Sequence, residues 1–209
     1  AVWKVNKYTV YFDTRFEEYL MPVTYEYGDV VELPPITRRG YVFDGWHLDG
    51  QQIDYLRMPA QDVTLVAEWT AADGIPYTVT FYLEDLDGKL MQDSERTMIC
   101  YGTTGEKVTY VYPEIEGFTF DVNNSIIEAR IAPDGSTEIE LYYTRNQYDF
   151  ITYADGEVFA EYRYPYGISI ADTDFPTKVG HSFVKWIDRA TGEEIAFPFA
   201  MPAENVELE

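Results

Sequence analysis

One short aromatic pattern occurs twice in this chain of 209 residues. Residues 38–46 read RRGYVFDGW and residues 178–186 read KVGHSFVKW. The residues that recur at the same spacing are Gly40, Phe43 and Trp46 and then Gly180, Phe183 and Trp186. Self-similarity of this kind is the signature of repeated structural modules. The chain is therefore expected to fold as several small cores rather than as one large one.

The surroundings of the pattern repeat as well. The first unit opens with YTVYF (8–12) and closes with VTLVAEW (63–69), and the third opens with YDFIT (148–152) and closes with VELE (206–209). A middle segment runs from YTVTFY (77–82) to STEIELYY (136–143) and shares the plan without the tryptophan. Three units of about 70 residues follow from this spacing. We expect the boundaries to be 1–6 (the end of a preceding repeat, or a linker), 7–70, a linker at 71–76, 77–144, and 145–209 with a truncated closing strand.

The two ends of the chain continue the same pattern. Joining them gives NVELEAVWKVNKYTV, which aligns with DVTLVAEWTAADGIPYTV except for a shorter linker. We hypothesise that the residues are one period of a longer tandem array. A competing explanation for Leu208 and Glu209 is a scar left by cloning.

Alternation of apolar and polar residues predicts strands at both ends of each unit. In YTVYF, Tyr8, Val10 and Phe12 fall on one face, as a strand with one buried side requires. Val63 and Leu65 alternate in the same way in a closing strand. Between these strands, LPPITRRG (33–40) predicts one or two helical turns, with proline early and glycine at the end. Asp49-Gly50 and Asp87-Gly88 predict hairpins, as TGEE (191–194) does in the third unit.

The spacing of the aromatic pattern also makes a specific prediction. Phe43 shares a strand face with Tyr41, whereas Trp46 lies at odd separation and falls on the opposite face. A bulge at Gly45 would bring all three rings to the core. Lys185 takes the place of this glycine in the third unit. There the bulge uses another residue or the tryptophan faces the other way.

Composition excludes several classes of protein. Hydrophobic residues at 46% and aromatic residues at 17% exclude intrinsic disorder. A formal charge of −22 opposes binding to nucleic acid and to anionic membranes. Cys100 has no partner for an internal disulfide, and its apolar neighbours predict a buried thiol. No apolar run is long enough to predict direct insertion into a membrane.

The sequence offers no convincing catalytic constellation. His47 and His181 are too few for a histidine-rich zinc site. Paired acids such as Asp85 and Asp87 could serve a glycosidase or a calcium loop, but EDLDG (84–88) does not complete the calcium pattern, since Arg96 stands where its last ligand belongs. A hairpin turn is the simpler interpretation. We therefore predict a protein that is not an enzyme, with no catalytic residue, metal or cofactor.

Tyrosine, with 19 copies, is the residue type that could carry binding. Strings such as YEY, YVY and YRYPY place alternate rings on one strand face. Exposed rings can stack on sugars or anchor a protein partner, whereas cross-strand pairing is the structural alternative. The candidate ligand-binding residues are Tyr25, Tyr27, Tyr110, Tyr112, Tyr162 and Tyr164.

The aromatic pattern resembles that of a known family. GYVFDGW followed by MPAQDVTLVAEW is similar to the Listeria-Bacteroides repeat, the B-repeat of internalin-like surface proteins. The matching residues are Gly40, Tyr41, Phe43, Gly45, Trp46 and Trp69. The third unit departs from the pattern at His181 and Lys185. The middle unit, with TVTFYLEDLDGKL and a closing YYT, resembles a mucin-binding-protein-like (MucBP-like) module instead.

The resemblance implies a fold and a setting. The fold would be α+β and strand-dominated, with three tandem β-grasp-like modules in an elongated arrangement. The residues that close the cores would be Gly40, Tyr41, Phe43, Trp46, Trp69, Gly117, Phe118, Gly180, Phe183 and Trp186. It also implies an extracellular, non-catalytic repeat segment on the surface of bacteria, mostly Gram-positive, with its secretion signal and cell-wall anchor outside these residues.

Two functions remain open from the sequence. The first is a stalk, spacer or adhesion module whose partners are neighbouring repeats of the same chain. The alternative is a carbohydrate- or glycoprotein-binding module of mucin type, which would use the tyrosine faces to bind host or environmental glycans. Saturable binding to a glycan or mucin array would distinguish the second from the first.

Overall fold

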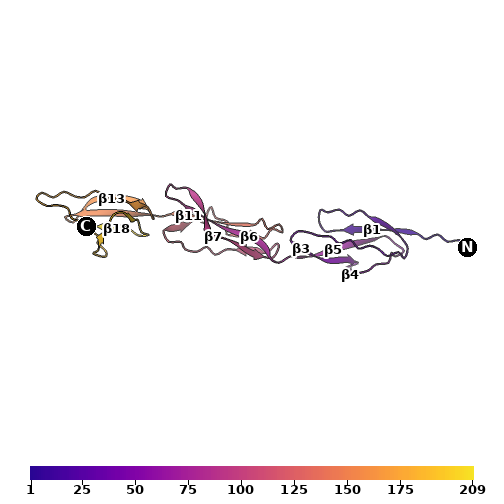
Figure 1. Cartoon of the computed structure of the whole chain (residues 1–209). Helices are drawn as coiled ribbons and strands as arrows, with labels where there is room; N and C mark the ends of the chain where they lie inside the picture. The colour runs from indigo at the N-terminus through magenta and orange to yellow at the C-terminus, as the bar shows by residue number, and fades with distance from the viewer. The chain divides into compact units, whose positions relative to one another are not determined.

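The chain folds entirely into strands, turns and loops. The computed structural model describes residues 1–209, and every regular element in it is a β-strand (Figure 1). The strand-dominated expectation is confirmed, whereas the helical part of the expected α+β class is wrong, because no helix forms. The chain divides into two compact units. The first comprises residues 1–77, 100–108 and 130–137, and the second residues 78–99, 109–129 and 138–209.

The helical turn expected at residues 33–40 is wrong. Residues 31–37 have no regular structure, and Arg38 forms an isolated bridge with Tyr41. Adjacent prolines at 34 and 35 carry no N–H, and the carbonyl of Pro34 accepts a hydrogen bond from the Trp46 indole at 2.8 Å instead of one within a helix. Gly40, at φ 75°, makes the turn back into the next strand.

The first compact unit contains a five-stranded mixed sheet of order β2-β1-β5-β3-β4. Its strands are β1 (Lys7–Asp13), β2 (Val23–Glu26), β3 (Tyr41–Leu48), β4 (Gln51–Ile53) and β5 (Val63–Ala71). β1 and β5 are parallel, whereas β3 is antiparallel to both β4 and β5. Asp49 and Gly50, both at positive φ, form the β3–β4 turn, so the hairpin predicted there is confirmed.

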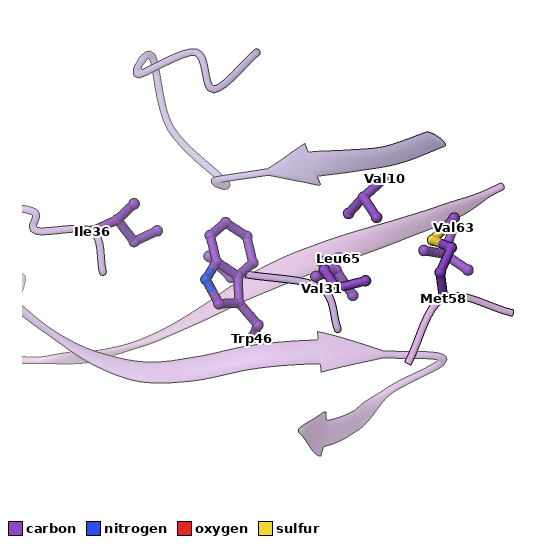
Figure 2. Packing of buried hydrophobic residues seen from close by; sticks show 8 residues of the cluster. Val10, Val31, Ile36, Trp46, Met58, Val63 and Leu65 are labelled. Carbon is purple, nitrogen blue, oxygen red and sulfur yellow. The ribbon is translucent and has the colours of Figure 1, made fainter. Parts of the chain in front are cut away.

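The core of this sheet is built around Trp46, which is only 2% exposed. Figure 2 shows its indole between the strands, with Val31 and Leu65 close by and Ile36 beyond its other end. The β3–β5 register shifts between Phe43 and Gly45. This shift is the predicted bulge, and it lets Trp46 and Phe43 pack together with ring centroids 5.7 Å apart.

A second sheet has four strands in the order β7-β6-β11-β9, and a pair of short strands has the order β10-β8. The strands are β6 (Ile75–Glu84), β7 (Leu90–Gly102), β8 (Lys107–Thr109), β9 (Phe118–Phe120), β10 (Glu128–Arg130) and β11 (Glu138–Arg145). β6 is parallel to β11. Tyr143 is among the most deeply buried residues of the four-stranded sheet and stacks with Phe81. Cys100, expected to be buried, is half-buried, because β7 is an edge strand.

The last part of the second compact unit holds a three-stranded sheet of order β13-β12-β18 and two strand pairs, β14-β17 and β15-β16. Its strands are β12 (Gln147–Ala154), β13 (Glu157–Pro165), β14 (Ser169–Ile170), β15 (Trp186–Ile187), β16 (Glu194–Ile195), β17 (Phe199–Ala200) and β18 (Val206–Leu208). Its core cluster is Phe150, Ile170, Trp186, Met201, Val206 and Leu208.

One pairing recurs along the chain. An opening strand lies parallel to a later closing strand in β1 with β5, in β6 with β11 and in β12 with β18. A parallel pair requires a long crossover between its strands. In each case that crossover carries the aromatic or glycine pattern seen in the sequence, so the repeated residues lie on the segments that cover the parallel pair.

Candidate functional site

The two histidines have structural surroundings. His47 is half-buried on β3, and its Nδ1 atom is buried without a hydrogen-bond partner. His181 is exposed, with Nδ1 3.0 Å from the carbonyl oxygen of Val179. No group of three or more His, Cys, Asp or Glu side chains is gathered in a way that could hold a metal ion. Neither imidazole lies in a cluster of groups suited to acid–base chemistry.

The acidic loop at residues 84–88 is a turn. Asp85 Oδ1 accepts hydrogen bonds from the backbone N–H groups of Asp87 and Lys89, each at 2.9 Å. The backbone N–H of Asp85 donates to the carbonyl of Lys89 at 2.8 Å, which closes the loop between β6 and β7. An Asp that bonds its own backbone two residues on is a common turn former. The hairpin interpretation of this stretch is confirmed.

The six candidate tyrosines lie in different environments. Tyr27 is exposed, whereas Tyr25 is half-buried against the first core, where its hydroxyl accepts a hydrogen bond from the Glu32 N–H at 3.2 Å. Tyr110 is half-buried edge-on to Phe81. Tyr112 is partly exposed and stacks on Phe120, with centroids 3.6 Å apart. The structure brings only Tyr162 and Tyr164 together.

Of the six candidate tyrosines, Tyr162 and Tyr164 are the two that border a polar groove together. Their rings are stacked, with centroids 5.8 Å apart at 21°. One face of the pair packs on Phe150 in the core. The groove beside them, of about 370 Å³, is lined by Tyr162, Tyr164, Asp172, Thr173, Asp174 and Phe175.

Polar groups inside this groove are oriented by hydrogen bonds. The Tyr162 hydroxyl donates to Asp174 Oδ2 at 3.1 Å, and this bond, with burial adding to it, raises the pKa of the phenol. The Thr173 hydroxyl oxygen is buried and has no hydrogen-bond partner. An aromatic wall next to carboxylates and a hydroxyl is chemistry that suits a sugar ring. Sequence reasoning missed Asp172, Thr173 and Asp174, although the acidic run ADTDF that follows YRYPY was the available signal.

The predicted core residues divide into two groups. Trp46 and Trp186 are buried, Gly117 is buried, and Tyr41, Phe43, Trp69 and Phe118 are half-buried. Gly40 is half-buried where a neighbouring loop crosses it, and Pro133 would meet any side chain added there. Gly180 is exposed and Phe183 is 39% exposed. These last two are not part of the third core cluster.

The comparisons with known proteins agree with this architecture. Residues 8–68 and 148–208 match the Listeria-Bacteroides repeat domain. Each match begins in an opening strand and ends in a closing strand. The two matches together cover more than half of the chain, and the chain therefore belongs to the Listeria-Bacteroides repeat family.

The relatives include an internalin and two proteins provisionally named as membrane proteins. Internalin H of Listeria monocytogenes is 33% identical over 126 residues, covering 54% of this chain and 19% of that protein. A protein of Evansella cellulosilytica, provisionally named a membrane protein, is 27% identical over 227 residues, covering 100% of this chain and 32% of the relative. A second protein of that organism, provisionally named a Gly-rich membrane protein, is 28% identical over 89% of the chain and 23% of its own length.

The chain spans a third or less of each of these relatives. It also contains no helix with the length and apolar character needed to cross a membrane. In both matched repeats the opening strand lies parallel to the closing strand.

Proposed function

We propose that the chain is a non-catalytic repeat segment of a bacterial cell-surface protein that acts as a stalk, spacer or adhesion module. The observation that carries the proposal is the position of the repeated aromatic residues. Trp46 and Trp186, the most distinctive residues of the pattern, are 2% and 4% exposed and belong to separate hydrophobic cores. Because these repeated residues are buried in the cores, they are not available at the surface to bind a substrate.

The modular organisation is part of this proposal. Three β-grasp-like modules would occupy residues 7–70, 77–144 and 145–209, with the middle one of the mucin-binding type. The recurrent parallel pairing of opening and closing strands supports this division. The partners of each module would be its neighbouring repeats, and the setting would be extracellular, in keeping with the surface and membrane relatives.

Surface location can be tested on intact cells of the source bacterium. Brief treatment of whole cells with trypsin should release peptides from this chain, because its arginines and lysines lie largely at the surface of the folded protein. No peptides of a cytosolic marker protein should appear in the same digest, which shows that the cells stayed intact. Release only after cell lysis would contradict the proposed location.

A second candidate function rests on the Tyr162–Tyr164 groove. Glycan binding there would use the stacked rings as a platform and the Asp172 and Asp174 carboxylates as hydrogen-bond acceptors. A glycan and mucin array should then show saturable binding that falls at least about tenfold in Tyr164→Ala, the loss expected for one stacking anchor. Tyr11→Ala, at an exposed tyrosine on β1, is the matched control. If the unaltered chain binds nothing on the array, the stalk role remains and the glycan site is excluded.

A further inference from the structure

The polar groove beside Tyr162 lies at a position that both matched repeats share, the first repeat at residues 8–68 and the last repeat at 148–208. Val10 faces Val23 in the first repeat, and Phe150 faces Tyr162 in the last. Val10 and Phe150 each pair with the opening residue of the closing strand. Tyr162 therefore corresponds to Val23, and the two grooves that border these residues can be compared.

The groove of the first repeat is apolar. It has a volume of about 250 Å³, and it is lined by Phe12, Leu20, Met21, Val23, Tyr25, Glu32 and Pro34. Leu20 and Met21 belong to residues 14–22, which connect β1 to β2. Glu32 is the only charged residue in this lining. The first groove therefore suits an apolar group better than a polar ligand.

The last repeat replaces these apolar groups with polar ones. Here the turn of Asp155 and Gly156 connects β12 to β13, and this short connection contributes nothing to the groove. Asp172, Thr173 and Asp174 line the groove instead, beside the tyrosine rings. The groove of the last repeat thus contains two carboxylates and a threonine hydroxyl, in place of the aliphatic side chains of the first.

Neither carboxylate of this groove pairs with a basic side chain. The basic residues of 147–209 all form ion pairs with other carboxylates, namely Arg163 with Asp149, Lys178 with Asp155, Lys185 with Glu194, and Arg189 with Glu207 and Glu209. Asp174 accepts a hydrogen bond from the Tyr162 hydroxyl at 3.1 Å, and Asp172 accepts one from the Thr173 N–H at 2.8 Å. The groove therefore carries negative charge that no basic residue of the chain neutralises.

A ligand with an ammonium group complements this charge. A hydrogen bond from an ammonium to a carboxylate is about twice as strong as one between neutral groups. The rings of Tyr162 and Tyr164, with centroids 5.8 Å apart, add an apolar face on which a sugar can stack and which attracts a cation. A sugar that carries its own carboxylate would be repelled by Asp172 and Asp174.

The Thr173 hydroxyl favours a sugar over a lysine side chain. Its oxygen is buried and has no hydrogen-bond partner, which costs free energy in the unbound protein. A hydroxyl both donates and accepts hydrogen bonds, whereas an ammonium group can only donate them. An amino sugar carries both kinds of group, so it can complement the hydroxyl as well as the carboxylates.

We propose that the groove of the last repeat binds an amino sugar with a free ammonium group, which Asp172 and Asp174 hold while the ring stacks on Tyr162 and Tyr164. The inference rests on the glycan-binding candidate function and deepens it by naming the class of sugar. It does not depend on the stalk role. Sugars whose amine is acetylated lack the charge and bind more weakly.

Titration of the whole chain with two defined oligosaccharides tests the proposal. The probes are a β-1,4-linked tetramer of glucosamine and the same tetramer with every amine acetylated. Isothermal titration calorimetry at an ionic strength of about 0.15 M screens long-range attraction to a protein with a formal charge of −22. The glucosamine tetramer should bind at least about fivefold more tightly, the gain expected when a charged donor replaces a neutral one.

Matched double variants separate the groove from the general negative charge. Asp172→Asn with Asp174→Asn should remove the preference for the glucosamine tetramer. Asparagine keeps an oxygen that accepts each hydrogen bond, so the groove should keep its shape. Glu114→Gln with Glu116→Gln removes the same amount of charge at exposed positions of the middle segment, and it should leave the preference unchanged.

A tetralysine peptide distinguishes a sugar ligand from a basic protein segment. It should bind at least about fivefold more weakly than the glucosamine tetramer, because it offers no acceptor to the Thr173 hydroxyl. Peptide binding as tight as that of the sugar would overturn the choice of an amino sugar.

The remaining outcomes separate the inference from the glycan-binding candidate itself. Equal binding of the two tetrasaccharides, or an equal loss in the two double variants, would overturn the ammonium preference and leave glycan binding in place. Binding of neither tetrasaccharide would also overturn the inference. The glycan array then decides separately whether the groove binds any other glycan.

Discussion

The first and third sheets carry the same aromatic pattern and differ in how much of it becomes strand. In the first, β3 has 8 residues and pairs with a β5 of 9 residues. In the third, β15 has 2 residues and β18 has 3. The residues of HSFVKW are as suited to a strand as those of YVFDGW, so local preference does not explain the difference. Strand length here depends on the presence of a partner strand.

A second difference concerns the bulge. Gly45, at φ 131°, lets the first sheet turn both Phe43 and Trp46 toward the core. Lys185 holds the equivalent place and forms an ion pair with Glu194 at 3.2 Å. Trp186 is nevertheless buried, with Phe183 and Phe159 beside it. An unpaired segment can orient its tryptophan without a glycine bulge, because no ladder fixes its register.

The largest effect is expected from removing the tryptophan of the paired sheet. Trp46→Ala should lower the free energy of unfolding of the first sheet by about 3 to 5 kcal/mol, through the lost indole contacts and the cavity left behind. Trp186→Ala should cost less, because no hydrogen bond like that from Trp46 to Pro34 holds its indole. Urea unfolding followed by circular dichroism measures both. Equal losses at the two sites would contradict the comparison.

Gly40 and Gly180 provide a matched pair with the same backbone conformation. Gly40 and Gly180 both have φ 75°, so alanine at either should cost about 1 kcal/mol in backbone strain. Only Gly40 faces a neighbouring loop, with Pro133 in the way, and overpacking there should add about 1 to 3 kcal/mol. Thermal unfolding of Gly40→Ala and Gly180→Ala compares them directly. The absence of an additional loss at Gly40 would show that the loop does not rest on this glycine.

Substitution at the bulge position should affect stability in the first sheet but not in the third. Gly45→Ala should destabilise the first sheet by about 1 to 2 kcal/mol, because φ 131° is unfavourable for any residue with a Cβ. The reciprocal change, Lys185→Gly, should alter stability by less than about 0.5 kcal/mol, as expected for an exposed position. Chemical unfolding of the two variants tests this. A gain of stability in Lys185→Gly would mean that the third sheet needs the same bulge.

The last prediction concerns the middle sheet, which has no tryptophan pattern to compare. Burial, with Tyr110 and Tyr112 nearby, raises the pKa of Tyr143 from 10.0 to about 12. The stability that the neutral phenol contributes is therefore complete below pH 10 and is lost between pH 10 and about 12. Tyr143→Phe should cost about 1 kcal/mol at pH 7, the value of its 2.8 Å hydrogen bond to the Pro113 carbonyl.

Unfolding measurements between pH 10 and 12 provide the decisive part of this test. The difference in unfolding free energy between the unaltered chain and Tyr143→Phe should shrink as the pH rises from 10 to 12. Using the difference cancels the other tyrosines, including Tyr142, whose pKa burial also raises. A difference that stays constant across this range would show that the Tyr143 phenol is not protected by burial.

Much of the strand plan was predictable because it depends on short-range pattern. Alternation in YTVYF, the Asp49-Gly50 turn and the bulge at Gly45 each follow from two or three neighbouring residues. The helix at residues 33–40 failed because Pro34 bonds a residue distant in sequence, Trp46. The half-buried state of Cys100 depends on the edge position of β7, which sequence alone does not specify.

The candidate sites were harder to predict for a physical reason. Tyrosines at alternate positions were visible, but which of them adjoin a polar groove depends on the loop at 172–175 that folds back beside Tyr162. Likewise, the sequence shows that Gly40 and Gly180 recur, whereas only the tertiary structure shows that Pro133 lies close to Gly40. Sequence repeats predict where similar local structure occurs, whereas the contacts that each repeat makes depend on the tertiary structure.

The central claim is that the repeated pattern exists to be closed by a partner strand, and one measurement tests it most directly. The residues AEWTA, which are 67–71 of the first sheet, can be appended after Glu209. The account predicts that the amides of residues 182–185 then become protected from hydrogen exchange, as those of β3 are, and that the third sheet unfolds at a higher urea concentration. Unchanged exchange at residues 182–185 in the extended chain would contradict it.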